Sequence, residues 1–269
     1  MTSSPKLFPP VGYCIYCWAC GPGVKLTDEH IIPYSMGGRE ILPKSSCLQC
    51  SAITGAYEGH CVDAQFQHVR AHLGLRSRKR GLVKSAPVII DGQKQQLPTD
   101  EHPSMYMSFK FPLPGLIRNE PDVERVNARI FMASMVPNFR QRLDRLGRRH
   151  VNLAPRDLVP LTLARVVAKI GHAWAVANLG GVKFAPFLRP VILQGHERRA
   201  AQLIGTLERE GPLVESPMHS VALITVRHRG YVLYAVKVRL FAPIDTNEHV
   251  VIVGAPMLHR TPPQITLVR

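Results

Sequence analysis

Apolar residues in the N-terminal part of the chain change from an extended to a helical spacing. Glu29-His30-Ile31-Ile32 is predicted to form a short strand that Pro33 ends, and Glu40–Pro43 is a second extended segment beyond a turn at Ser35–Gly38. After these segments, apolar side chains recur at roughly helical spacing: Ile53, Tyr57, Val62, Phe66, Val69 and Leu73. The order strand, turn, strand, helix is therefore predicted here.

The middle of the chain alternates in a way that is typical of strands. Val83–Ile90 and Gln93–Leu97 flank the tight turn Asp91-Gly92, and Met105–Phe111 is also predicted to be extended. A helix, interrupted by a proline, is predicted within residues 123–147.

The last third of the chain predicts one long helix and an antiparallel sheet. Leu158–Leu179 has an apolar face at helical spacing, and the following Gly180-Gly181 ends the helix. Val221–Val226 and Tyr231–Leu240 are predicted strands around a turn, and Val250–Val253 is another. The predicted fold class is α+β, with an N-terminal ββα zinc unit before a larger α+β domain that contains an antiparallel sheet.

A dense basic run, Arg76–Gly81, predicts a boundary between two domains. We expect a zinc-stabilised unit over residues 1–80 and an α+β domain over residues 81–269, whose role no motif indicates. The simplest interpretation of the basic run itself is a solvated linker.

Composition and charge narrow the classes of function. The 269 residues are 45% hydrophobic and 20% charged, which favours a packed core over global disorder. The net charge of +15 attracts polyanions, and nucleic acid is the commonest soluble polyanion. A membrane surface is the competing polyanion, but no apolar run approaches the length of a transmembrane helix and no signal segment opens the chain. A cytoplasmic location is expected.

Six cysteines gather in the first quarter of the chain, and four of them form the pairs Cys14-x-x-Cys17 and Cys47-x-x-Cys50. A two-residue turn lets both thiolates of such a pair face one ion, which is the spacing of a zinc knuckle. In a chain of this length without a secretion signal, metal binding is favoured over disulfides.

Two further cysteines bear on that zinc site. Cys17-Trp-Ala-Cys20 has the same knuckle spacing, so Cys20 is an alternative to Cys14 as a ligand. Cys61 is expected to be a core residue of the predicted helix.

The tetrapeptide Thr27-Asp28-Glu29-His30 occurs a second time as Thr99–His102. The second copy has no cysteine pairs near it and no apolar strand after it, and it is predicted to be a polar turn before Pro103. The surroundings of the first copy, and not the four letters, therefore carry any functional argument.

Several elements in order resemble the zinc-containing HNH endonucleases: Cys14-x-x-Cys17, Glu29-His30-Ile31-Ile32-Pro33, Gly37-Gly38, Cys47-x-x-Cys50 and a helix that carries Glu58. The resemblance covers about the first quarter of the chain. It implies a ββα-metal unit, metal-dependent hydrolysis of DNA, most simply double-stranded, and structural zinc on Cys14, Cys17, Cys47 and Cys50.

The residue chemistry agrees with that resemblance. His30 is the candidate general base, because imidazole titrates near neutral pH without special help. Glu29 is a hard oxygen donor that suits a catalytic Mg²⁺ or Mn²⁺, and one such metal would offset charge on the phosphate and on the leaving oxygen. Glu58 is the expected second ligand of that metal, with His60 as the alternative.

The sequence departs from the family pattern at two places. Leu42, Ser45 and Ser46 stand where the family's middle asparagine is expected, and a serine could supply part of its hydrogen bonding. Ser51 directly follows Cys50, where the third motif usually begins.

Basic residues beside the predicted nuclease helix are candidates for phosphate contacts: Arg70, Arg76, Arg78, Lys79 and Arg80. A second basic group lies further along the chain: Arg140, Arg142, Arg145, Arg148 and Arg149. No aromatic platform is interleaved with either group, so stacking on single strands is not indicated.

Two hypotheses of different class follow. The first is a metal-dependent HNH endonuclease. The alternative is a non-catalytic zinc module that binds nucleic acid or a partner protein, which the departures from the family pattern favour. A weaker third idea is a toxin or defence effector whose C-terminal domain senses a signal.

Overall fold

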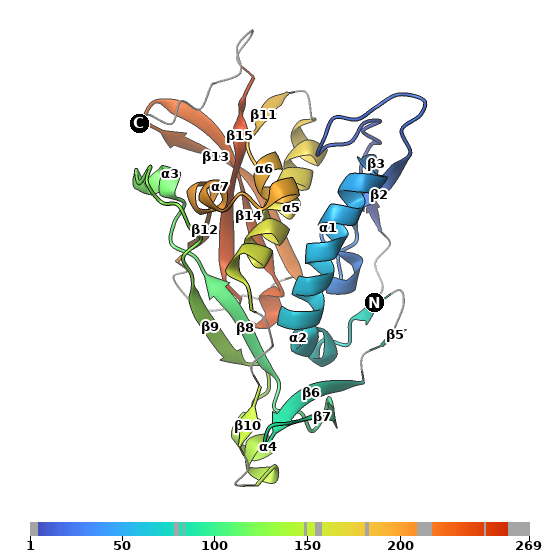
Figure 1. The fold of residues 1–269 in the computed structure, drawn as a ribbon, viewed down its shortest axis with the longest axis vertical. Helices are drawn as coiled ribbons and strands as arrows, with labels where there is room; N and C mark the ends of the chain where they lie inside the picture. The colour runs from blue at the N-terminus through green and yellow to red at the C-terminus, as the bar shows by residue number, and fades with distance from the viewer. Residues whose placement is uncertain are drawn as a thin grey trace.

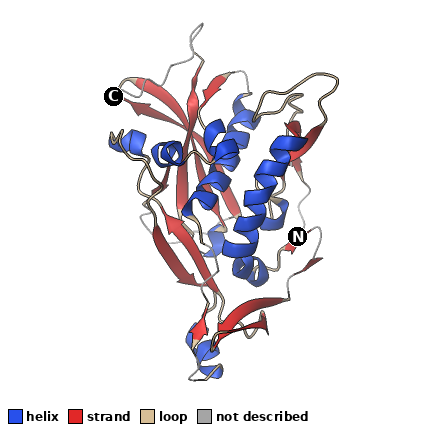
Figure 2. Ribbon diagram, in the orientation of Figure 1, coloured by secondary structure: helices blue, strands red, loops and turns tan. Residues whose placement is uncertain are grey.

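A computed structural model describes residues 5–77, 81–82, 84–147, 150–153, 158–180, 183–208, 217–244 and 246–257 (Figure 1). Helices and antiparallel strands are mixed along the chain, so the expected α+β class is confirmed (Figure 2). None of the described helices is both long and apolar enough to cross a membrane.

The N-terminal region forms a small three-stranded sheet followed by a helix. Its strands are β1 (Lys6–Leu7), β2 (Leu26–His30) and β3 (Glu40–Cys47), in the order β1-β3-β2, and a 3-10 turn at Tyr34–Met36 joins β2 to β3. Helix α1 (Leu48–His60) follows β3 without a loop. The predicted order of strand, turn, strand and helix is confirmed.

The helical pattern that was predicted to run to Leu73 is divided into three pieces. A π-helical segment at Cys61–Gln65 follows α1, and α2 (Gln67–His72) comes next. The Phe66 N–H bonds to the carbonyl of Cys61, five residues back, at 3.1 Å, which widens the turn between the two helices.

The middle of the chain forms hairpins that extend away from the main body at the lower end of Figure 1. Its elements are β4 (Arg76–Ser77), β5 (Gly81–Leu82), β6 (Ser85–Ile90), β7 (Gln93–Pro98), β8 (Met105–Lys110), α3 (Gly115–Arg118), β9 (Arg129–Ser134), α4 (Phe139–Arg145) and β10 (Val151–Asn152). The β6–β7 hairpin around Asp91-Gly92 and the strand at β8 confirm the predictions, and β6 with β8 contributes to a second small core: Val88, Ile90, Met107 and Leu153.

The helix predicted within residues 123–147 is wrong over its first part. Residues 129–134 are strand β9, which pairs antiparallel with β8 from Met105↔Ser134 to Lys110↔Arg129. Pairing with the strand β8 decides the structure of this segment, which local sequence alone does not. A helix forms only after Pro137, as α4.

The last third contains a five-stranded sheet and the longest helix. The strands are β11 (Phe184–Pro186), β12 (Ile204–Leu207), β13 (His219–His228), β14 (Tyr231–Leu240) and β15 (Glu248–Pro256). Their order is β11-β15-β14-β13, with β12 also paired to β15. The helices are α5 (Pro160–Leu179), α6 (Arg189–Gln194) and α7 (Glu197–Leu203), with a 3-10 turn at Ala242–Ile244.

Helix α5 lies between this sheet and the N-terminal unit, with β13, β14 and β15 on one side and α1 on the other (Figure 1). Gly171 allows the close approach to the sheet, because a Cβ there would lie 3.2 Å from a methyl carbon of Val251. One hydrophobic core is continuous from Cys14 to Ala255, across the boundary predicted near residue 80.

Candidate metal centre and buried carboxylate pair

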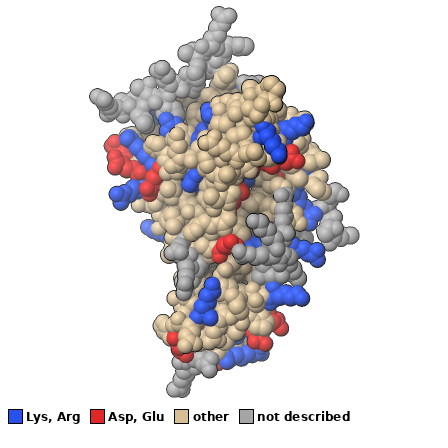
Figure 3. Space-filling model, turned by 45° about the vertical axis from the view of Figure 1, so that its right-hand side comes forward, with Lys and Arg blue, Asp and Glu red and all other residues tan. Residues whose placement is uncertain are grey.

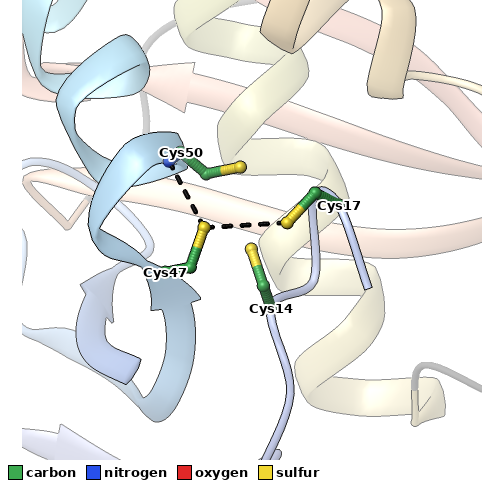
Figure 4. A group of neighbouring side chains, drawn as sticks. All are labelled: Cys14, Cys17, Cys47 and Cys50. Carbon is green, nitrogen blue, oxygen red and sulfur yellow. Dashed lines mark hydrogen bonds between the residues drawn. The ribbon is translucent and has the colours of Figure 1, made fainter. Parts of the chain in front are cut away.

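Four thiols gather at one point between the start of α1 and the loop that carries Cys14 and Cys17, here named the knuckle loop (Figure 4). They belong to Cys14, Cys17, Cys47 and Cys50. Their sulfur atoms all lie within 4.8 Å of one another, and those of Cys17 and Cys47 are 3.6 Å apart. Tetrahedral zinc with bonds of about 2.3 Å needs sulfur separations of about 3.8 Å. The cluster could therefore hold a structural metal such as zinc. Cys20 is exposed and lies outside it, so Cys14 belongs to the ligand set.

Local backbone structure positions each pair of thiols. Cys47 ends β3 and caps α1, and its sulfur accepts the N–H of Cys50 at 3.5 Å. The N–H of Trp18 bonds to the carbonyl of Cys14 at 2.8 Å and closes the knuckle turn. Burial raises the pKa of the Cys14 thiol and that of Cys50. For Cys47, burial is outweighed by the hydrogen bonds it accepts from Cys50 and the neighbouring thiols, so its pKa is lowered. A bound metal would displace the thiol protons.

A bulge in β3 forms hydrogen bonds with the knuckle loop. The register between β2 and β3 shifts after Thr27, and Lys44 adopts a left-handed conformation with φ of 48°. Asp28 accepts the N–H of Lys44 at 3.1 Å, so this acid supports the bulge. Three successive carbonyls of the bulge accept N–H groups of the loop: Pro43 from Val11, Lys44 from Gly12, and Ser45 from Ile15.

Two side chains of the C-terminal half also form hydrogen bonds with carbonyls of the knuckle loop. His172 on α5 is fully buried, with Nε2 2.8 Å from the carbonyl oxygen of Ile15; because a carbonyl only accepts, Nε2 carries the proton. Burial lowers the pKa of His172 to about 4, so the ring is neutral at neutral pH. Arg189 on α6 donates through Nε to the carbonyl of Tyr16.

Glu29 on β2 and Glu58 on α1 converge on one cation, the ammonium of Lys169 on α5. Lys169 Nζ contacts Glu29 Oε1 and lies 2.8 Å from Glu58 Oε1. The same ammonium donates to the carbonyl of His30 and reaches that of Ile31 at 3.4 Å. The side chain of Lys169 is 1% exposed, that of Glu29 7% and that of Glu58 17%. This cluster, Glu29, Glu58 and Lys169, is named the carboxylate-lysine cluster.

Burial and charge act in opposite directions within the carboxylate-lysine cluster. Burial lowers the pKa of Lys169, but the two carboxylates outweigh it, and the net pKa is raised. The ammonium is therefore charged at neutral pH. Burial raises the pKa of Glu29, and Lys169 only partly offsets this effect. Tyr16 and Tyr57 lie against the same carboxylates, and burial together with these negative charges raises the pKa of both phenols.

The predicted ligands of a catalytic metal are thus brought together, but a lysine fills the place between them. His60 is exposed at the end of α1, so Glu58 and not His60 joins Glu29. The chemistry of two carboxylate oxygens suits a divalent cation. The expected Mg²⁺ or Mn²⁺ gains no support, because the pair already compensates the charge of Lys169.

His30 lies at the end of β2 with a partly buried side chain. Its ring centroid is 6.0 Å from that of Tyr34, with an edge-on geometry. Ser45 and Ser46, considered as substitutes for the family's asparagine, instead donate to main-chain carbonyls, Ser45 to Leu42 at 2.6 Å and Ser46 to Cys47 at 3.5 Å.

The predicted phosphate-binding residues differ in their exposure to solvent. Arg70 is 5% exposed, donates to the carbonyl of Ser35 at 2.8 Å and lies 3.8 Å from Asp63, so it is not presented to a phosphate. Arg76 is exposed on β4. The remaining three, Arg78, Lys79 and Arg80, lie outside the described residues. On the face seen in Figure 3, basic side chains are spread over both the upper and the lower parts of the molecule.

Sequence reasoning did not identify Lys169 as part of the site. A signal was present, because Lys169 is the one formal charge between Arg165 and Lys183. Its neighbours in the sequence are all apolar: Val166, Val167, Ala168 and Ile170. A charge in such a position needs a buried partner. The sequence did not show which of the 19 acidic residues would supply it.

Comparison of the chain with protein-family models, with curated proteins and with solved structures found no match.

Proposed function

We propose that this protein hydrolyses phosphodiester bonds of DNA, with His30 as the general base of a zinc-stabilised N-terminal unit. The observation that carries the proposal is the meeting of Glu29 and Glu58, from β2 and α1, beside four gathered thiols. A chance occurrence of the motif gives no reason for these two acids to meet at one cation. The second copy of the tetrapeptide has no such arrangement in the described part of the chain.

Each group of residues would have a separate role in the reaction. His30 would accept a proton from the attacking water, because a neutral imidazole is the side chain suited to this near pH 7. Glu29 and Glu58 would hold a divalent Mg²⁺ or Mn²⁺, which when bound supplies positive charge for the phosphate and the leaving oxygen. The four cysteines would hold zinc and fix β2, β3 and α1 relative to one another.

The choice of DNA as substrate rests on charge. The chain has 34 basic and 19 acidic residues, and exposed basic groups such as Arg76 on β4 adjoin the N-terminal unit. Neutralising several phosphates makes binding steeply dependent on salt and insensitive to base sequence.

Nicking of supercoiled plasmid by zinc-loaded protein tests the proposal. We expect Mg²⁺- or Mn²⁺-dependent nicking that falls by at least about a hundredfold in His30→Ala, which is the lower end of what a general base contributes. His150→Ala is the matched control, because His150 is exposed in a loop distant in sequence from the N-terminal unit. Plasmid that stays intact across divalent metals and salt concentrations would sink the hydrolysis proposal.

A second candidate function is a non-catalytic zinc module that binds DNA. The specific observation in its favour is Lys169, whose side chain is 1% exposed and whose ammonium already contacts both carboxylates. On this hypothesis, salt-sensitive DNA binding persists in His30→Ala and is lost in Cys47→Ser, and no metal produces nicking. A gel-shift series over these two variants establishes the binding, and the absence of nicking by the binding-competent wild type separates this function from the first proposal.

A further inference from the structure

The carboxylate-lysine cluster contains one positive charge and two negative charges in a nearly closed space. Lys169 Nζ has four oxygen neighbours: Glu29 Oε1, Glu58 Oε1 and the carbonyls of His30 and Ile31. An ammonium has three hydrogens to donate, so its bonding is fully satisfied where it lies. The cluster as a whole is short of one positive charge.

We propose that Lys169 is an internal competitor for a divalent metal, so that the ammonium and the metal exclude each other between Glu29 and Glu58. The inference deepens the proposed function, and it rests on that function only in treating these two carboxylates as the cation site.

Mutual exclusion follows from the geometry of the cluster. The same oxygen of Glu58 that would bind a metal lies 2.8 Å from the ammonium, and Glu29 Oε1 contacts it as well. A metal bound to both oxygens would lie within a few ångströms of the ammonium, and like charges at that separation repel strongly where water cannot screen them. Metal entry therefore requires the Lys169 ammonium to move away from both carboxylates, and its only other acceptors among the described residues are the carbonyls of His30 and Ile31.

A second observation points to a cation site at this place. Tyr16 is fully buried, and Tyr57 is nearly so. The Tyr57 hydroxyl has no hydrogen-bond partner in the described part of the chain, and the Tyr16 hydroxyl lies within hydrogen-bonding reach of the Glu29 carboxylate. Both lie close enough to Glu29 and Glu58 for the negative charges to raise the pKa of the phenols. Two buried phenol oxygen atoms beside two carboxylates are further donors that a hard cation could use once the ammonium is removed.

The two tyrosines also provide a built-in probe. Tb³⁺ is a hard cation that takes the same oxygen ligands as Ca²⁺ and Mg²⁺, and it becomes luminescent when a nearby tyrosine is excited. Zinc-loaded protein is used, because the soft thiolates are then occupied. Tb³⁺ is titrated into wild-type protein and into Lys169→Met, which keeps the length of the side chain and removes its charge.

We expect Lys169→Met to bind Tb³⁺ at least tenfold more tightly than the wild type, with tyrosine-sensitised luminescence that Glu29→Gln in the same background abolishes. Lys169→Arg keeps a cation and should behave as the wild type. Lys110→Met is the matched control, because Lys110 lies 2.9 Å from Glu208 in an exposed pair. Equal affinity in the wild type and Lys169→Met, or no binding to either, would overturn the inference.

Lys169→Met leaves two buried carboxylates without a counter-charge and could unfold. Thermal unfolding with and without Mn²⁺ covers that case: the inference expects Mn²⁺ to raise the Tm of Lys169→Met and to leave that of the wild type unchanged. A variant that stays unfolded with Mn²⁺ present would also count against it, since the metal then fails to take the place of the ammonium. Plasmid nicking is scored separately, so tight metal binding without nicking would retain the inference and reject hydrolysis.

Discussion

The two copies of Thr-Asp-Glu-His have identical letters and opposite burial. In the first copy Glu29 is buried against Lys169, and the His30 side chain lies partly open at the end of β2. In the second copy Glu101 is exposed, and His102 is fully buried. The buried residue is therefore the acid in the first copy and the histidine in the second.

The difference arises from what surrounds each copy. The first is part of β2, where alternation turns Glu29 toward α5. The second forms the predicted turn after β7, where the N–H groups of Glu101 and His102 both bond to the carbonyl of Pro98. His102 Nε2 lies 3.0 Å from the carbonyl of Pro87, and its ring centroid is 4.6 Å from that of His68. The predicted turn therefore forms, but His102 is not a surface residue of it, because its ring fills space beside β6.

Removing zinc from the four-cysteine cluster should produce the largest difference between the two copies, in their protection from hydrogen exchange. Structural zinc contributes about 10 kcal/mol or more to small zinc-dependent folds. We expect Cys47→Ser, or chelation of the wild type, to open the N-terminal unit. Hydrogen exchange should then lose protection at His30 and Ile31 and keep it at Glu101 and His102, which lie beside the smaller core. Equal loss at both copies would show that the four-cysteine cluster does not distinguish them.

Neutralising the acid in each copy should give the next largest difference. Glu29→Gln replaces one of the two carboxylates that contact Lys169 by a neutral amide, and losing a hydrogen bond between charged groups costs about 2 kcal/mol of the free energy of unfolding. Glu101→Gln alters an exposed side chain and should change that free energy by less than about 0.5 kcal/mol. Urea unfolding at pH 7 measures both. A difference below about 1 kcal/mol would contradict the structural role assigned to Glu29.

Acid should affect the surroundings of the second copy through its buried histidine pair, with the smallest effect of the three. Burial, with the nearby His102, lowers the pKa of His68 from its ordinary 6.5 to about 4. A lowered pKa in the folded state gives stability that is fully present above pH 6.5 and is lost as pH falls toward 4. For His68 alone, the loss between pH 7 and pH 5.5 is about 1 kcal/mol.

The corresponding variant is His68→Gln, which should lose about 1 kcal/mol less than the wild type over this interval, measured by urea unfolding at the two pH values. His150→Gln, at an exposed position, is the control and should keep the wild-type dependence on pH. An unchanged dependence in His68→Gln would mean that the ring is already accessible to protons in the folded protein.

Much of the fold could be predicted because the relevant signal is local. The β13–β14 hairpin and helix α5 were predicted from alternation and helical spacing. The spacing of the cysteines indicated a four-thiol cluster but left Cys14 and Cys20 as alternatives, and the structure places Cys14 in it. Prediction failed where a distant partner decides the outcome. Residues 129–134 lie where a helix was predicted, yet they form β9 because β8 is available to pair with them.

The same distinction between local signals and distant partners applies to the candidate site. The sequence by itself determined the knuckle pairs, the strand that carries Glu29 and His30, and the helix that carries Glu58, because each depends on residues a few positions apart. Only the tertiary structure decided that Lys169 lies between the two acids, since it bonds to the carbonyl of His30 across 139 positions of sequence. A buried charge must find its counter-charge wherever the chain folds, and sequence spacing holds no record of that distance.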